Sequence, residues 1–323
     1  MKKLVLLDGH AIIHRAYHAL PELTTREGQP VNAVYGFANM LLKVIDTLNP
    51  THMVVAFDLP IATFRHEAYI GYQSHRPTTD DGLKSQISLV RELVEAAGIK
   101  TLSCPGFEAD DIIGTLAVQA ETDEVIIVTG DRDILQLVRD KVRVRDGREK
   151  SVKVYMLTSG LSQAKVFGEQ EVEEYLGVKP SEMVEYKALV GDPSDNYPGV
   201  LGIGPKTAID LIRNFGTVEN LYKSLEQRTP EAKKLGEKVV QKLKEGYESA
   251  MLSHKLATII TDAPIEINLE DAKIEDVAHR KEFLDKLHEF GFKSLHKRLT
   301  GEERETENTR PEKKRSNGQI GLL

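Results

Sequence analysis

The sequence predicts an α/β fold in which a mostly parallel sheet with flanking helices precedes a smaller all-α domain. Short, continuous apolar runs recur in the first half of the chain, and helical patterns lie between them. From about residue 170 onward, helical patterns with short loops continue without a convincing strand. The chain has 323 residues, 40% of them hydrophobic, which is enough for one large or two moderate hydrophobic cores.

Three apolar runs predict the strands of the sheet. They are LVLLD at residues 4–8, MVVAFD at residues 53–58 and EVIIVTGD at residues 124–131. None of them alternates between apolar and polar residues. A continuous apolar run of this length is typical of a strand that is buried on both faces of a parallel sheet.

Helical patterns separate the predicted strands, at residues 33–47, 85–97 and 110–119. Alternating strands and helices predict right-handed crossover connections. Later helical patterns cover residues 171–175, 180–190, 206–214, 218–224 and 230–252. We therefore expect one domain over residues 1–165 and a helical domain over residues 166–297. Residues 298–323 should form a disordered charged tail, because residues 301–318 include no aliphatic or aromatic side chain.

Composition favours a soluble, cytoplasmic protein. The single cysteine, Cys104, cannot form an internal disulfide, which fits a reducing compartment. The first apolar run is too short for a signal peptide or a membrane span, so we expect no membrane association. No heptad pattern suggests more than a monomer. The net charge of −7 argues against a nucleic-acid partner, unless the acids are concentrated in a metal site.

Acidic residues gather where the predicted strands end. Asp8 and Asp58 close the first two apolar runs, Asp131 closes the third, and the carboxyl ends of parallel strands meet at one edge of a sheet. FEADD opens the helix predicted at residues 110–119, and GDPSDNYPG holds two more acids in a tight loop. The candidate metal ligands are Asp8, Glu108, Asp110, Asp111, Asp131, Asp133, Asp192 and Asp195.

Local geometry predicts how some of these acids point. Glu108 and Asp111 are three positions apart, so both can face one side of a first helical turn. Asp131 and Asp133 flank Arg132 in a loop that we expect to be extended, so these two acids should point the same way. Adjacent acids on one turn cannot both point into a site, so either Asp110 or Asp111 would act through bound water. Asp58 is expected at most to support the site.

Divalent cations explain the accumulation of acids better than solvation does. Two unit charges about 4 Å apart repel by about 4 kcal/mol at an effective dielectric constant of about 20. Mg²⁺ prefers oxygen ligands, and a pair of such ions can activate water for phosphodiester hydrolysis. The cluster includes no histidine or cysteine, which argues against zinc. The alternative is a set of solvated helix starts and turns, where acids are also favoured.

A second motif, GIGPKTA, predicts a phosphate-binding turn. Gly202 and Gly204 allow close approach of the backbone, and a proline follows at the first position of the next helix. Lys206 and Thr207 lie in the first turn, where free amide groups attract anions. Together with the amphipathic helix that follows, the motif matches a helix-hairpin-helix element that holds a nucleic-acid backbone.

Taken together, the motifs resemble the 5′-nuclease family, which includes the 5′→3′ exonuclease domain of bacterial DNA polymerase I. The resemblance covers about residues 1–295 and rests on LLDGH, AVYGF, FRHEAY, GFEADD, TGDRDILQL and GDPSDNYPGVLGIGPKTA. It implies a PIN-like nuclease domain, a helical arch over the site and a helix-hairpin-helix domain on duplex DNA. It also implies two Mg²⁺ or Mn²⁺ ions held by the eight acids, and a K⁺ ion near the hairpin.

The activity that the resemblance implies is hydrolysis of 5′ ends and 5′ flaps to 5′-phosphate and 3′-hydroxyl products. Primer removal during replication and repair would use it. One alternative is a structure-specific DNA-binding protein with weakened or lost catalysis, which would have no use for so many acids. A PIN-type ribonuclease is another, and such a chain would not need the GIGPKTA domain.

The arch departs from the family pattern at one position. The family carries a lysine after the tyrosine and an arginine three residues later, whereas this chain reads GYQSHRP. Arg76 is therefore kept, but Gln73 replaces the lysine. Arg65, Gln73 and Arg76 are the candidate phosphate contacts, and Asp58 or Glu67 are alternative salt-bridge partners of the two arginines.

Two expectations concern the end of the chain. No polymerase domain follows, so we expect a stand-alone nuclease. Residues 319–323, QIGLL, resemble the short peptide by which bacterial proteins bind the sliding clamp. The alternative is a chance apolar end.

Overall fold

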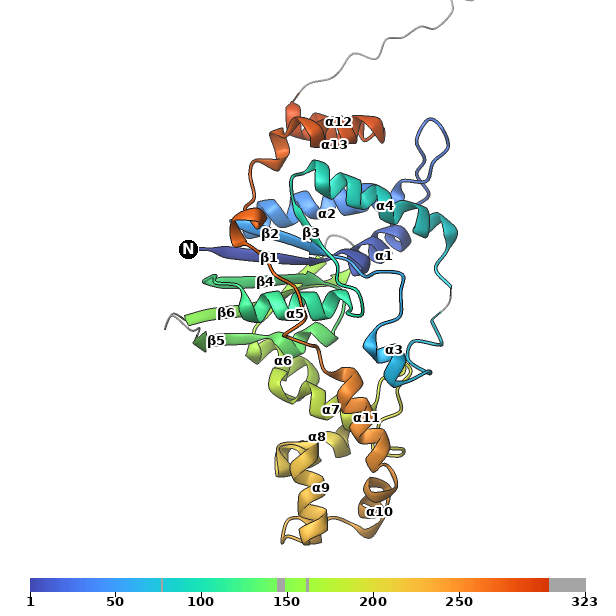
Figure 1. Ribbon diagram of the computed structural model, residues 1–323, viewed down its shortest axis with the longest axis vertical. Helices are drawn as coiled ribbons and strands as arrows, with labels where there is room; N and C mark the ends of the chain where they lie inside the picture. Colours follow the sequence, from blue (N-terminus) through green and yellow to red (C-terminus); the bar gives the residue numbers. More distant parts are fainter. Residues whose placement is uncertain (77, 144–148, 161–162, 302–323) are drawn as a thin grey trace, which may run out of the picture.

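The computed structural model describes residues 1–76, 78–143, 149–160 and 163–301. Their centre is a seven-stranded sheet in the order β3-β2-β1-β4-β6-β5, with β7 paired to β6 (Figure 1). Strands β3, β2, β1, β4 and β6 are parallel, and β5 and β7 run antiparallel to β6. The strands are β1 Lys3–Asp8, β2 His52–Ala56, β3 Lys100–Leu102, β4 Glu124–Thr129, β5 Arg139–Arg143, β6 Glu149–Ser159 and β7 Gln163–Phe167. The predicted mostly parallel α/β sheet is confirmed.

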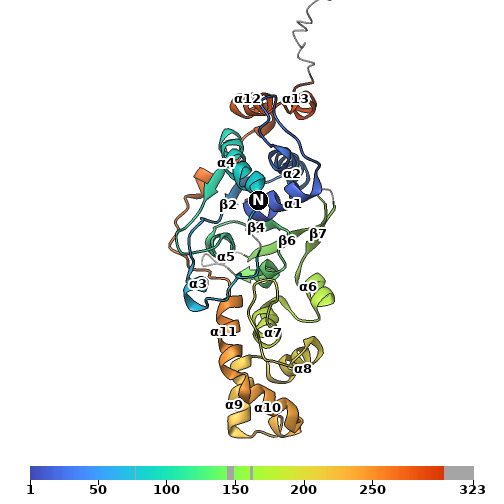
Figure 2. The same ribbon diagram turned by 90° about the vertical axis from the view of Figure 1, so that its right-hand side faces the viewer.

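The sheet is buried on both faces, which explains the continuous apolar runs. In β1, Leu4 and Leu6 belong to one hydrophobic core, whereas Val5 and Leu7 belong to the other. Helix α5 covers the first face, and α1, α2 and α4 cover the second (Figures 1 and 2). Because every side chain of such a strand is buried, no position favours a polar residue.

The helices that match predicted patterns in this part agree with them to within a few residues at each end. Helices α1 and α3 were not predicted; α1 begins directly after β1, where Asp8 caps it. The helices are α1 Gly9–Ala19, α2 Asn32–Leu48, α3 Phe64–Ala68, α4 Asp81–Ala96, α5 Ala109–Gln119 and α6 Glu169–Leu176. Residues 69–76 connect α3 toward α4 beside the sheet, where the sequence predicts the arch (Figure 1).

The helical part lies at the far end of the molecule in Figure 1. It comprises α7 Met183–Val190, α8 Pro205–Phe215, α9 Val218–Gln227, α10 Glu237–Glu245 and α11 Tyr247–Ala257, with short 3₁₀ turns at Pro180–Glu182 and Ala232–Lys234. The helix predicted over residues 230–252 is wrong as a single element, because it is interrupted at Gly246. A Cβ at Gly246 would lie 2.7 Å from the side chain of Val200, so the break coincides with a close packing contact.

The chain then returns to the sheet domain. The backbone amides of Ile260 and Ala263 bond to side chains of α5, and short 3₁₀ turns follow at Leu269–Ala272 and Val277–His279. Helices α12 Lys281–Glu289 and α13 Lys293–Thr300 pack over α2 and α4 (Figure 2). Residues Phe283 and Leu287 of α12 belong to the core that includes Val5 and Leu7 of β1. The domain limits at residues 165 and 297 stay predictions. Within the described ranges, the longest apolar helices fall short of a membrane span.

Candidate metal centre

The ends of β1 and β4 are joined through Asp8. This last residue of β1 is 5% exposed. Its Oδ1 accepts a hydrogen bond from the Ala11 amide at 2.9 Å, which caps α1, and its Oδ2 accepts one from the Thr129 hydroxyl at 2.9 Å. Neutral donors thus fix the carboxylate at the carboxyl edge of the sheet, where the sequence placed it.

The charges of four acids act on one another near the ends of β1 and β4, and we call Asp8, Glu108, Asp110 and Asp131 the strand-end group. Burial raises the pKa of Asp110 well above its ordinary value, and the nearby charges of Asp131 and Asp8 raise it further. Burial also raises the pKa of Asp8 to about 7, with Asp131 adding to the effect. Carboxyl groups that raise each other's pKa in this way favour binding of a cation between them.

A second group of acids lies next to the first. One carboxylate oxygen from each of Asp133, Asp192 and Asp195 lies within 4.8 Å of the others, and we call these residues the acidic trio. Asp133 begins the 3₁₀ turn Asp133–Leu137, and the other two lie in the loop after α7. An all-carboxylate donor set fits a hard divalent cation better than zinc.

Asp131 connects the strand-end group to the acidic trio. The predicted extended loop is wrong, because Arg132 has helical backbone angles and a 3₁₀ turn starts at Asp133. The Asp133 amide donates to Asp131 Oδ1 at 2.8 Å, so the aspartate itself stabilises the turn. As a result the two acids serve different groups, although the charge of Asp131 still raises the pKa of Asp133.

Lys187 was not recognised from the sequence. Its Nζ donates to Asp133 Oδ1 and, at 2.5 Å, to Asp192 Oδ2. This ammonium group holds the pKa of Asp192 below its ordinary value although burial opposes the shift, whereas burial raises the pKa of Asp133 to about 7. A single lysine in a helical pattern gives no signal, because only the fold brings it to the two acids.

Arg65 and Asp111 form a buried ion pair. Arg65 is 2% exposed, and its two terminal nitrogens donate to both oxygens of Asp111 at 2.7 and 2.8 Å. It also contacts Glu108 at 3.2 Å and the carbonyl groups of Leu256 and Thr258. Asp58 and Glu67 were thus wrong as alternative partners for Arg65.

Backbone amides and neighbouring side chains also contact the acids around Arg65. The amides of Glu108 and Ile260 donate to Asp111, so both of its oxygens are engaged. Burial raises the pKa of Glu108 to about 6, although Arg65 lowers it. Asp58 accepts from the Ala109 amide at 2.8 Å and lies 3.3 Å from His10, so it positions the start of α5.

The arch segment contacts the acidic trio directly. Arg76 donates to Asp195 Oδ1 at 2.7 Å, and the side chain of Gln73 reaches the same oxygen at 3.3 Å. The backbone amide of Gln73 also donates to the Asp195 carbonyl, and the side chain of Asn196 donates to the Gly71 carbonyl. The predicted alternative partners of Arg76, Asp58 and Glu67, were wrong here too, since its described partner is Asp195.

The hairpin residues lie apart from the acids, at the start of α8. Gly202 has φ +80°, and Lys242 Nζ donates to its carbonyl at 2.8 Å. Gly204 precedes Pro205, the first residue of α8. Lys206 is exposed and Thr207 is half-buried in the first turn, so amide groups and an ammonium group face solvent together.

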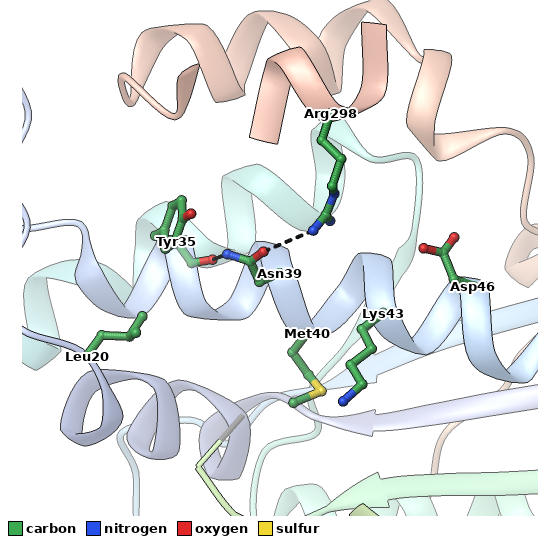
Figure 3. A pocket seen from close by; sticks show the side chains of 7 residues that line it. All are labelled: Leu20, Tyr35, Asn39, Met40, Lys43, Asp46 and Arg298. Carbon is green, nitrogen blue, oxygen red and sulfur yellow. Dashed lines mark hydrogen bonds between the residues drawn. The ribbon is translucent and has the colours of Figure 1, made fainter. Parts of the chain in front are cut away.

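Two cavities differ in where they lie relative to the candidate acids. One of about 400 Å³ lies between α2 and α13 and includes none of the candidate acids; Figure 3 shows Asn39 and Arg298 bonded across it. The other, of about 570 Å³, lies beside Asp131 and is lined by His14, Arg15 and His18 of α1. Only the second cavity adjoins the metal centre.

Comparison with known proteins places the chain among nucleases. Residues 3–177 match the family model of the 5′-3′ exonuclease N-terminal resolvase-like domain, and residues 178–280 match that of the 5′-3′ exonuclease C-terminal SAM fold. A 5′-3′ exonuclease of Aquifex aeolicus is 39% identical, over 93% of this chain and 96% of that protein. DNA polymerase I of Bacillus subtilis is 39% identical over 95% of this chain, which spans only 33% of the polymerase.

Solved structures of low sequence identity share the fold. The D15 protein of bacteriophage T5, co-crystallised with metal ions, has a TM-score of 0.65 at 19% identity, over 93% of this chain and 97% of that one. The catalytic core of Rad2 in complex with DNA substrate has a TM-score of 0.53 at 19% identity, over 93% and 88% of the two chains. Since both family models match in order and the Aquifex relative has nearly the same extent, the chain belongs to the 5′-3′ exonuclease family.

Proposed function

We propose that this protein is a metal-dependent 5′→3′ exonuclease and 5′-flap endonuclease that hydrolyses phosphodiester bonds of DNA. The observation that carries the proposal is the acidic trio, with oxygens within 4.8 Å, next to a strand-end group at the carboxyl edge of the sheet. Membership of the 5′-3′ exonuclease family supports it. Primer removal and repair in the cytoplasm, by a monomer, are the setting that we propose.

The carboxylates would hold two Mg²⁺ or Mn²⁺ ions, one in the strand-end group and one in the acidic trio. Such ions lower the pKa of bound water and stabilise a leaving oxygen. Asp111 would support the first site without binding an ion, because Arg65 and two amides already occupy its oxygens. Tyr72 would orient Glu108, to which its hydroxyl donates at 3.2 Å.

The DNA substrate would contact two further surfaces. Gly202, Gly204, Lys206 and Thr207 at the start of α8 would hold phosphates of the duplex, with K⁺ as a further ligand of the hairpin. In the arch, Arg76 and Gln73 would face the phosphate at the reacting bond once cations occupy the acids. Arg65 is too deeply buried for direct contact with a phosphate, so we propose a supporting role for it.

The test is cleavage of a 5′-labelled flap duplex with Mg²⁺. Asp131→Ala should reduce the rate by about a thousandfold or more, since the residue belongs to the strand-end group and its charge also acts on Asp133. The matched control Asp271→Ala removes an exposed acid of a 3₁₀ turn and should leave the rate unchanged. Specific flap binding without Mg²⁺-dependent products would instead favour the alternative of a DNA-binding protein without catalysis.

Residues 319–323, proposed to bind a sliding clamp, lie outside the described part of the chain. The proposal therefore rests on the sequence QIGLL alone. Binding of the peptide 318–323 to the cognate clamp can be titrated beside a scrambled peptide. Equal binding of the two peptides would end this proposal.

A further inference from the structure

Protein cations already occupy the acidic trio. Lys187, on α7, has a side chain that is 13% exposed, and its Nζ bonds to Asp133 and Asp192 at once. The third member, Asp195, accepts a hydrogen bond from the guanidinium of Arg76 at 2.7 Å. Three carboxylates thus face two positively charged side chains.

The strand-end group has a different set of partners. Asp8 accepts from the Ala11 amide and the Thr129 hydroxyl, and Asp131 accepts from the Asp133 amide. All of these donors are neutral. These bonds do not offset the repulsion between Asp8, Asp110 and Asp131, whereas Glu108 is partly compensated by Arg65. A divalent cation therefore gains the attraction of the first three acids.

We infer that Lys187 competes with the second divalent cation, so that the two metal sites load unequally. An ammonium group and a metal ion cannot both lie between Asp133 and Asp192, so binding there must displace Nζ. In the strand-end group the described cation is Arg65, which contacts Glu108 at 3.2 Å but bonds with both terminal nitrogens to Asp111. The bonds described for Asp8 and Asp131 come from neutral donors, so this group binds its ion first and more tightly. The inference rests on the proposed function only in taking the acids to be metal ligands.

The loop after α7 also holds Asp192 through hydrogen bonds that do not involve Lys187. Asp192 Oδ1 accepts from the Ser194 amide at 2.7 Å, from its hydroxyl at 2.5 Å and from the Asp195 amide at 3.3 Å. These bonds hold the carboxylate through Oδ1, whereas Lys187 uses Oδ2. The flexible stem of lysine allows the ammonium group to move while α7 stays in place.

The test counts Mn²⁺ ions bound to the DNA-free, full-length protein by electron paramagnetic resonance. The natural protein should bind one ion tightly and a second more weakly. Lys187→Met should tighten the second site about tenfold or more, because one competing charge is gone, and leave the first within about twofold. Lys187→Arg retains the charge and should keep the second site weak. Asp195→Asn should weaken only the second site.

Lys286→Met is the matched control, since it removes a lysine of the remote helix α12 that pairs with Glu92 of α4 and with Glu289. It should change neither site. An unchanged or weaker second site in Lys187→Met, with a melting temperature like that of the natural protein, would overturn the inference. If Lys187→Met does not fold, two equally tight ions in the natural protein would overturn it. Absence of any bound Mn²⁺ would instead remove the metal premise of the proposed function.

Discussion

At the scale of single residues, Arg65 shows how a cation beside a metal centre can serve structure. An arginine on the surface can change its partners, whereas Arg65 is enclosed by Asp111, Glu108 and two backbone carbonyls. Removing one partner of a buried pair leaves an uncompensated charge, which costs several kcal/mol. The position of Asp111, and through it the start of α5, depends on this pair.

We therefore expect Arg65→Met to lower the free energy of unfolding by about 3–5 kcal/mol, because Asp111 would stay buried without its partner. Urea unfolding of the metal-free protein measures the change. Arg76→Met is the control; it breaks a half-exposed pair and should cost less than about 1 kcal/mol. Equal stability of the two variants would contradict the structural role of Arg65.

Gln73 is the residue at which the arch departs from the family. It has φ +54° and bonds to Asp195 with both its backbone and its side chain. The amide of glutamine can donate to a phosphate, but charged donors bind about twice as strongly. Gln73→Lys should raise the single-turnover rate of flap cleavage at neutral pH, and Gln73→Met, which lacks the donor, should lower it. If Gln73→Lys left the cleavage rate unchanged or lowered it, the result would show that the site has adapted to glutamine.

At the scale of elements, the N-terminus of α8 is the part of the helical domain that we expect to grip DNA. Lys206→Ala should weaken binding of duplex DNA about equally for all sequences. It should also reduce the slope of log affinity against log salt by about one, as expected for one lost phosphate contact. Fluorescence anisotropy over a salt series measures both effects. The control is Lys281→Ala, an exposed lysine at the start of α12; a slope that changes equally in both variants would argue against a specific contact.

The strands differ in how well the sequence alone predicts them. The runs that became β1, β2 and β4 are buried on both faces and are visible as unbroken apolar stretches. By contrast, β5 (RDKVR) and β7 (QAKVF) carry charged residues, and β3 has only three residues. Such strands form because β6 or β2 offers a partner, which is a property of the assembled sheet and not of the local sequence.

At the scale of the whole molecule, metal binding and stability should be coupled through pH. The metal-free folded state retains protons on Asp8 and Asp133, whose pKa values are about 7, whereas the unfolded chain loses them near the ordinary value of 3.8. Between these values the unfolded state binds fewer protons, so these groups lower the free energy of unfolding as pH rises. A divalent ion replaces the protons and removes this loss.

We expect the rise in melting temperature on addition of saturating Mg²⁺ to be larger at about pH 8 than at about pH 5.5. The rise is the quantity to compare, because histidines with lowered pKa, such as His10 and His66, shift the metal-free stability in the opposite direction. Differential scanning fluorimetry measures it. In Asp8→Asn, which has no carboxylate to titrate there, the dependence on pH should be smaller. A rise that is independent of pH in the natural protein would contradict the assignment.

The sequence by itself determined the α/β class, the three central strands and the helical second part, and it named the acids that are candidates for the metal centre. It could do so because continuous burial, helical periodicity and acids at strand ends are local patterns. Only the tertiary structure decided that Asp131 and Asp133 belong to different groups, that Asp111 turns to Arg65, and that Lys187 lies in the acidic trio. Each of these facts depends on side chains that are far apart in sequence or on a backbone turn, and no local pattern encodes which of several acids a buried cation will reach.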